Sequence, residues 1–70
     1  MIIKDIKDNC VYVEYNGNNY MIKRDYIGGT SIINYWLYGC YGTDDYEYFI
    51  NDLTTLEGAL LTIRDIEERG

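Results

Sequence analysis

The feature that most constrains the fold of this 70-residue chain is a pair of alternating apolar and polar runs that flank an Asn-Gly pair. The runs span residues 11–15 and 19–23, and Asn16 and Gly17 lie between them. Asn and Gly tolerate the positive φ angles of a type I′ turn, whose twist matches that of two paired strands. The pattern therefore predicts a β-hairpin. Whether the turn falls at Asn16-Gly17 or one residue later, the same side chains share its core face: Val11, Val13, Tyr20 and Ile22.

Three further segments have the character of strands. Residues 2–7 place isoleucines among charges, which predicts a short edge strand or a frayed arm. Residues 31–38 are rich in β-branched and aromatic side chains, which favours a strand over a short helix capped at Ser31. Residues 46–50 alternate as a strand does, and a helix that begins at Thr43 is the alternative.

The clearest helical pattern lies near the carboxy terminus. Thr54 begins a Thr-Thr-Leu-Glu sequence that matches a capping box, in which the Thr54 hydroxyl accepts a hydrogen bond from the Glu57 amide. An apolar stripe of helical spacing follows, made of Leu56, Ala59, Leu60, Ile63 and Ile66. The opposite face is expected to carry Glu57, Arg64, Asp65, Glu67 and Glu68. Gly58 costs about 1 kcal/mol relative to alanine in mid-helix, so we expect it to permit close contact between this helix and a sheet.

Together these elements predict an α+β fold, with an antiparallel β-meander of four or five strands and one carboxy-terminal α-helix packed on one face. The length predicts a single domain over residues 1–70. One helix covers one side of the sheet, so the other side is expected to show Tyr12, Glu14 and Lys23 to water or to a partner. Trp36, Phe49 and about half of the nine tyrosines are expected in the core, because a small domain has few other large groups to bury.

The chain lacks the sequence features of several classes of enzyme. It has no histidine, which removes histidine-assisted nucleophiles and most zinc sites. The Gly28-Gly29 pair has neither the spacing nor the lysine of a phosphate-binding loop. A calcium loop beginning at Asp44 would place Tyr46, Tyr48 and Thr55 where it needs oxygen ligands and a closing glutamate. We therefore expect a protein that is not an enzyme and that holds no metal or cofactor.

The cysteines and the apolar runs predict the compartment. Cys10 and Cys40 lack the spacing of a redox or zinc motif and the density of a secreted disulfide scaffold, so two reduced thiols are expected. No apolar run approaches the roughly 20 residues that span a bilayer. The sequence therefore predicts a cytoplasmic protein without a membrane partner.

The whole net charge of −6 lies in the second half of the chain. Residues 1–35 carry four acids and four bases, whereas residues 36–70 carry eight acids and two bases. The interval between Arg24 and Arg64 contains no base and is dense in tyrosine. Such a charge repels nucleic acid and attracts basic surfaces. We expect a basic protein partner and no direct binding of nucleic acid.

Two segments, residues 16–22 and the acidic, aromatic residues 44–53, together with the small size and acidic composition, resemble the small anti-CRISPR proteins of phages and mobile elements. The resemblance implies inhibition of a type II CRISPR-Cas nuclease in a bacterial host cell by DNA mimicry, with carboxylates occupying a basic cleft that normally reads the PAM duplex. The contact residues it implies are Tyr41, Asp44, Asp45, Tyr46, Glu47, Tyr48 and Asp52. The alternative is a phage or plasmid assembly module that self-associates through its exposed sheet, so both a monomer and a homodimer stay open.

Overall fold

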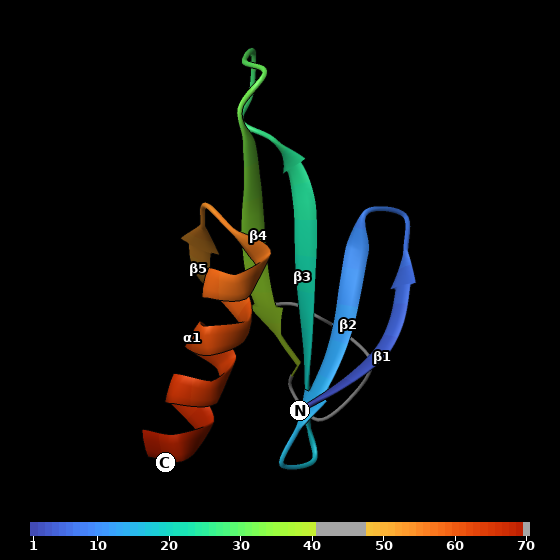
Figure 1. The fold of residues 1–70 in the computed structure, drawn as a ribbon, viewed down its shortest axis with the longest axis vertical. Coiled ribbons are helices and arrows are strands. Elements are labelled where there is room, and N and C mark those ends of the chain that lie inside the picture. Colours follow the sequence, from blue (N-terminus) through green and yellow to red (C-terminus); the bar gives the residue numbers. More distant parts are fainter. Residues whose placement is uncertain (41–47, 70) are drawn as a thin grey trace.

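The computed structural model describes residues 1–40 and 48–69 of the chain. These residues form five β-strands followed by one α-helix (Figure 1). The elements are β1 (Ile2–Lys7), β2 (Cys10–Tyr15), β3 (Asn18–Tyr26), β4 (Ile33–Gly39), β5 (Tyr48–Leu53) and α1 (Leu56–Arg69). Neighbouring strands are antiparallel, and their order in the sheet is their order in the chain. The predicted α+β fold with an antiparallel meander is therefore confirmed.

The predicted hairpin consists of β2 and β3. Its two-residue turn has φ angles of 52° at Asn16 and 81° at Gly17, the left-handed values that a type I′ turn requires at both positions. The register pairs Val11 with Ile22 and Val13 with Tyr20. These four side chains are buried on one face of the sheet, as the alternation predicted.

Strand β1 lies at one edge of the sheet and confirms the edge strand over the frayed arm. Its register with β2 shifts between Ile3 and Asp5, so Lys4 forms a β-bulge. All six of its residues are exposed.

The segments that allowed either a strand or a helix form strands where the structure describes them. Ile33–Gly39 pairs with both β3 and β5, so the helix capped at Ser31 does not form. Tyr48–Leu53 is the last strand, and its register with β4 shifts between Leu37 and Tyr38. The start of the alternative helix at Thr43, and the first two residues of the strand predicted at residues 46–50, lie outside the described residues.

Helix α1 begins one residue later than the capping-box pattern predicted. The Gly58 amide donates a hydrogen bond to Thr55 Oγ1 at 3.0 Å, so Thr55 is the amino-terminal cap and the prediction of Thr54 was wrong. The reason is that β5 continues to Leu53, which packs against the core, and the chain then turns through Thr54 and Thr55. A Cβ at Gly58 would lie 3.1 Å from Thr55 Oγ1 and 3.8 Å from Leu53 Cβ, so this glycine leaves room for the cap and the neighbouring strand.

The core lies between α1 and one face of the sheet, which we call the covered face. Figure 1 shows α1 beside β4 and β5, with β1 on the far side of the sheet. Among the described residues the helix contacts β2, β3, β4 and β5 but not β1. The buried apolar side chains are Val11, Val13, Tyr20, Ile22, Leu37, Ala59 and Ile63.

Two aromatic side chains expected in the core lie on the opposite face, which we call the open face. Leu37 points toward the helix and is fully buried, so its neighbour Trp36 points away. Trp36 pairs with Lys23, is half-buried and lies outside the core. Phe49 is 53% exposed. The expectation for both residues was wrong, because alternation along a strand decides the face and the size of the side chain does not.

Candidate functional site

Most of the predicted contact residues lie outside the described part of the chain: Tyr41, Asp44, Asp45, Tyr46 and Glu47. The remaining two, Tyr48 and Asp52, lie on β5. The residues that flank the acidic segment 41–47 are also described, with Gly39 and Cys40 before it and Tyr48 after it. Their positions show from which part of the fold this segment departs.

Tyr48 and Asp52 lie on opposite faces of β5. Tyr48 is half-buried, and its ring occupies the space that a Cβ at Gly39 would take on the covered face. Asp52 is exposed and pairs with Trp36 of the open face. Its Oδ2 accepts a hydrogen bond from Nδ2 of the buried Asn34 at 3.2 Å. The two described members of the predicted contact set therefore belong to different surfaces.

The flanks of the acidic segment lie at the end of the sheet where α1 ends. Gly39 is paired with Tyr20 on one side and with Tyr48 on the other. The Tyr20 hydroxyl donates a hydrogen bond to Glu67 in the last turn of α1. Figure 1 shows the carboxy-terminal end of α1 at the same end of the molecule as the β2–β3 turn. The fold thus brings helix carboxylates beside the point from which residues 41–47 depart.

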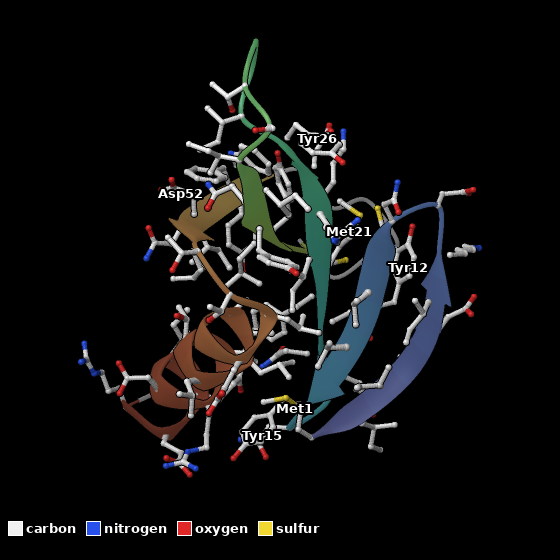
Figure 2. All side chains as sticks on the ribbon, turned by 45° about the horizontal axis from the view of Figure 1, so that its top comes forward. Met1, Tyr12, Tyr15, Met21, Tyr26 and Asp52 are labelled. Atoms are coloured by element: carbon white, nitrogen blue, oxygen red, sulfur yellow. The ribbon has the colours of Figure 1, made fainter. Side chains whose placement is uncertain are left out.

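Polar side chains of the hairpin hold these carboxylates. Asn18 Nδ2 donates to both carboxylate oxygens of Glu67 at 3.0 Å. The Tyr15 hydroxyl lies 3.5 Å from Glu68 Oε1, and Arg64 Nε lies 3.5 Å from Glu68 Oε2. Figure 2 shows Tyr15 at this end of the sheet, far from Asp52. We call this group the acidic end; it consists of Tyr15, Asn18, Tyr20, Tyr48, Glu67 and Glu68.

The prediction that placed Glu67 on the solvent face of the helix was wrong. Glu67 follows the fully buried Ile63 by four residues, so the helical period continues the covered stripe to it. A carboxylate is tolerated there because Asn18 and Tyr20 donate hydrogen bonds to it. Two features of the sequence could have indicated this position. Glu67 follows Ile63 at helical spacing, and the hairpin carries the polar groups of Asn18 and Tyr20 close to its turn.

Burial raises the pKa of the Tyr20 hydroxyl, because the phenolate form is disfavoured in an apolar environment. The hydrogen bond to Glu67 and the negative charge of that carboxylate raise the pKa further, and Tyr48 adds a smaller contribution. This tyrosine therefore keeps its proton in the folded protein at pH values at which an unfolded chain loses it.

The free energy of unfolding is expected to fall at alkaline pH through Tyr20. Because the folded pKa is raised, this stabilisation is complete below the unfolded pKa of about 10 and is lost as the pH rises above it, by about 1.4 kcal/mol per pH unit. Urea denaturation of the wild type and of Tyr20→Phe at about pH 8.5 and about pH 11 checks this expectation. The variant should lose less stability between the two pH values. Equal losses in both proteins would show that Tyr20 does not carry the effect.

A row of large side chains crosses the open face. Tyr12 pairs with Met21, Met21 with Tyr38, and Tyr38 with Phe49. The rings of Tyr38 and Phe49 meet edge to face with their centroids 5.7 Å apart. Lys7 Nζ lies 5.6 Å from the centroid of the Tyr12 ring. Figure 2 shows Tyr12 and Met21 on the neighbouring strands β2 and β3. This face offers apolar area but carries lysine beside its aromatic side chains.

The surplus negative charge of the described residues lies in β5 and α1. On β1 and β2 the charges offset one another, since Lys4 is paired with Glu14 and Lys7 with Asp5, each at 3.9 Å. Residues 48–69 contain five acids and two bases, which leaves three negative charges. Both bases are paired within the helix, where Arg69 lies 2.9 Å from Asp65 and Arg64 lies beside Glu68. The negative potential of the described residues is therefore concentrated around β5 and α1.

The described residues contain no group of three side chains that could hold a metal ion. Both cysteines are free thiols. In residues 1–40 and 48–69 no helix has the length and apolar character needed to cross a membrane. Comparison of the chain with protein-family models, with curated proteins and with solved structures found no match.

Proposed function

We propose that this protein is a non-enzymatic inhibitor that blocks a nuclease by binding its basic nucleic-acid cleft. The contact surface we propose is the acidic end together with the acidic segment 41–47. The observation that carries the proposal is the hydrogen bond from Tyr20 to Glu67, which places the end of α1 beside the flanks of that segment. The carboxylates at the end of α1 thereby lie near Gly39 and Tyr48, the described residues closest in the sequence to Asp44, Asp45 and Glu47.

The chemistry of such a surface suits a cleft built for phosphates. Carboxylates form charge-assisted and often bidentate hydrogen bonds with arginine, the residue that such clefts use most for planar anions. The segment 41–47 contributes Asp44, Asp45 and Glu47 from the sequence, and residues 48–69 contribute a further surplus of three negative charges. Complementary charge also raises the association rate with a basic partner.

The resemblance to anti-CRISPR proteins makes a type II CRISPR-Cas nuclease the target of this proposal. Such a nuclease reads its PAM with arginines and holds the guide–target heteroduplex in a positively charged channel. A protein bound over the arginines would exclude target DNA. On this view Asp52 supports the sheet through its hydrogen bond with Asn34 and lies outside the contact surface.

The proposal is tested with a panel of guide-loaded type II nucleases, by measuring DNA cleavage and direct binding at two salt concentrations. We expect inhibition of at least one nuclease and weaker binding at the higher salt concentration, because salt screens the charge attraction. The triple variant Asp44→Asn, Asp45→Asn, Glu47→Gln is expected to weaken binding by about tenfold to a hundredfold.

The matched control removes three negative charges from residues 1–35, outside the proposed contact surface. Its substitutions are Asp8→Asn, Glu14→Gln and Asp25→Asn, and we expect it to bind almost as the wild type does. If the two triple variants lost binding affinity equally, the affinity would depend on the net charge of the protein and not on a localised contact surface. Unaltered cleavage by every nuclease at excess protein would refute the proposed target.

A further inference from the structure

Strand β1 carries apolar side chains that nothing in the described structure covers. Ile3 pairs with Val13 and Ile6 pairs with Val11, so both isoleucines lie on the covered face of the sheet. Helix α1 does not reach them, and they are 51% and 67% exposed. Figure 1 shows β1 at the edge of the sheet farthest from α1.

The bulge at Lys4 is what places these two isoleucines on one face. In a regular strand, residues separated by three positions point to opposite faces. The extra residue of the bulge restores the same orientation for Ile3 and Ile6, and it leaves Lys4 and Asp5 together on the open face. Lys4 reaches Glu14 and Asn19 there, at 3.9 Å and 3.2 Å. The strand therefore has an apolar side and a charged side.

We propose that β1 pairs antiparallel with β1 of a second copy of this chain, about a two-fold axis between Lys4 and Asp5. In this register Ile3 of one copy lies opposite Ile6 of the other, on the covered face. Lys4 lies opposite Asp5, and Ile2 lies opposite Lys7, on the open face. Residues that are directly opposite each other in an antiparallel pair have their side chains on the same face of the sheet. Because the bulge places Ile3 with Ile6 on one face and Lys4 with Asp5 on the other, each of the proposed pairs meets this requirement.

Charge complementarity identifies the second copy as the occupant. Lysines and bulges on an edge strand usually prevent pairing. Here the two-fold axis places Lys4 of each copy opposite Asp5 of the other copy. The dimer therefore contains two pairs of opposite charges. The isoleucines of the two copies meet twice as well, which removes from water the apolar side chains that α1 leaves exposed. The same axis places both helices on one face of a continuous sheet.

This inference does not depend on the proposed function. The side chains of the acidic end belong to β2, β3, β5 and α1, whereas the pairing uses only the outer edge of β1. A dimer would leave both acidic ends accessible. Loss of inhibition and loss of dimerisation are therefore separate outcomes, measured on different variants.

Sedimentation velocity over a wide range of protein concentration tests the pairing, with a charge-reversal cycle to test its register. We expect a reversible dimer for the wild type. Lys4→Asp and Asp5→Lys each set like charges opposite each other twice, so each should raise the dimer dissociation constant by about tenfold or more. The double variant Lys4→Asp, Asp5→Lys restores opposite charges and should recover most of the affinity.

Ile6→Lys should also dissociate the dimer, whereas Ile32→Lys should not, because Ile32 is 59% exposed, close to the 67% of Ile6, but lies outside the sheet. Circular dichroism of each variant shows that the fold is retained. A wild-type monomer at every concentration would overturn the proposal. A dimer that survives Ile6→Lys but is lost in Phe49→Lys would overturn it in favour of association through the open face.

Discussion

Replacing Leu37 with alanine is expected to lower the free energy of unfolding by about 2–5 kcal/mol. Leu37 is fully buried, lies in the central part of β4 and pairs with the equally buried Ile22 beneath the helix. Truncation removes apolar contacts and leaves a cavity that the rigid sheet cannot close. A domain of this length has a total stability of roughly 4–10 kcal/mol, so the loss is a large fraction of it. Urea denaturation followed by the fluorescence of Trp36, the one tryptophan of the chain, measures the change.

The control for this substitution is Ile32→Ala. Ile32 is an aliphatic side chain of the same volume, but it is 59% exposed and lies before β4. We expect its truncation to change the free energy of unfolding by no more than about 0.5 kcal/mol. If the two variants were destabilised equally, Leu37 would not occupy the core that the structure assigns to it.

Replacing Gly39 with alanine is expected to cost about 1–3 kcal/mol of stability. Gly39 is buried at the end of β4, and the ring of Tyr48 occupies the space that its Cβ would need. The added methyl group must displace this ring from its place beside Tyr20. Thermal and urea denaturation of the variant give the size of the loss.

A double-mutant cycle separates the steric overlap between an alanine at position 39 and the Tyr48 ring from the intrinsic preference of a strand for alanine over glycine. In a Tyr48→Ala background the ring is absent, so Gly39→Ala should become neutral or stabilise by a few tenths of a kcal/mol, because alanine restricts the unfolded chain more than glycine does. Gly28→Ala is the matched control, since a Cβ there meets no atom within 4 Å. A Gly39→Ala cost that persists without the Tyr48 ring would contradict the overlap.

The hairpin was predictable because its signals are local. An Asn-Gly pair between alternating runs defines both the turn and the register, and the register defines which side chains share a face. The strand at β4 followed from side-chain type for the same reason. The face assignments of Trp36 and Phe49 failed where residue size was given more weight than alternation.

The start of α1 was harder to predict, because two adjacent threonines can each cap a helix. The sequence favoured Thr54 through its glutamate three residues later. In the structure Thr55 is the amino-terminal cap, because β5 extends to Leu53 and Leu53 packs against the core. Packing of the preceding strand outweighed the local capping pattern.

The candidate site was predictable in charge but not in arrangement. The sequence placed the negative surplus in the second half of the chain, and it marked Tyr48 and Asp52 as neighbours within one acidic segment. Strand alternation and the register shift between Leu37 and Tyr38 separate these two residues onto opposite faces. Conversely, the fold joins Glu67 to Tyr20 by a hydrogen bond although 47 positions separate the two residues in the chain.

The pattern of side chains along the chain is sufficient for the meander, the hairpin turn, the helix and the sign of the charge, because each depends on residues close in sequence. Only the tertiary structure decides that α1 stops short of β1, that a bulge places both Ile3 and Ile6 on the covered face beyond the reach of the helix, and that Glu67 joins the hairpin end. These features depend on strand register and on where the helix lies across the sheet. Both are set by long-range packing, so a local pattern of residues does not contain them.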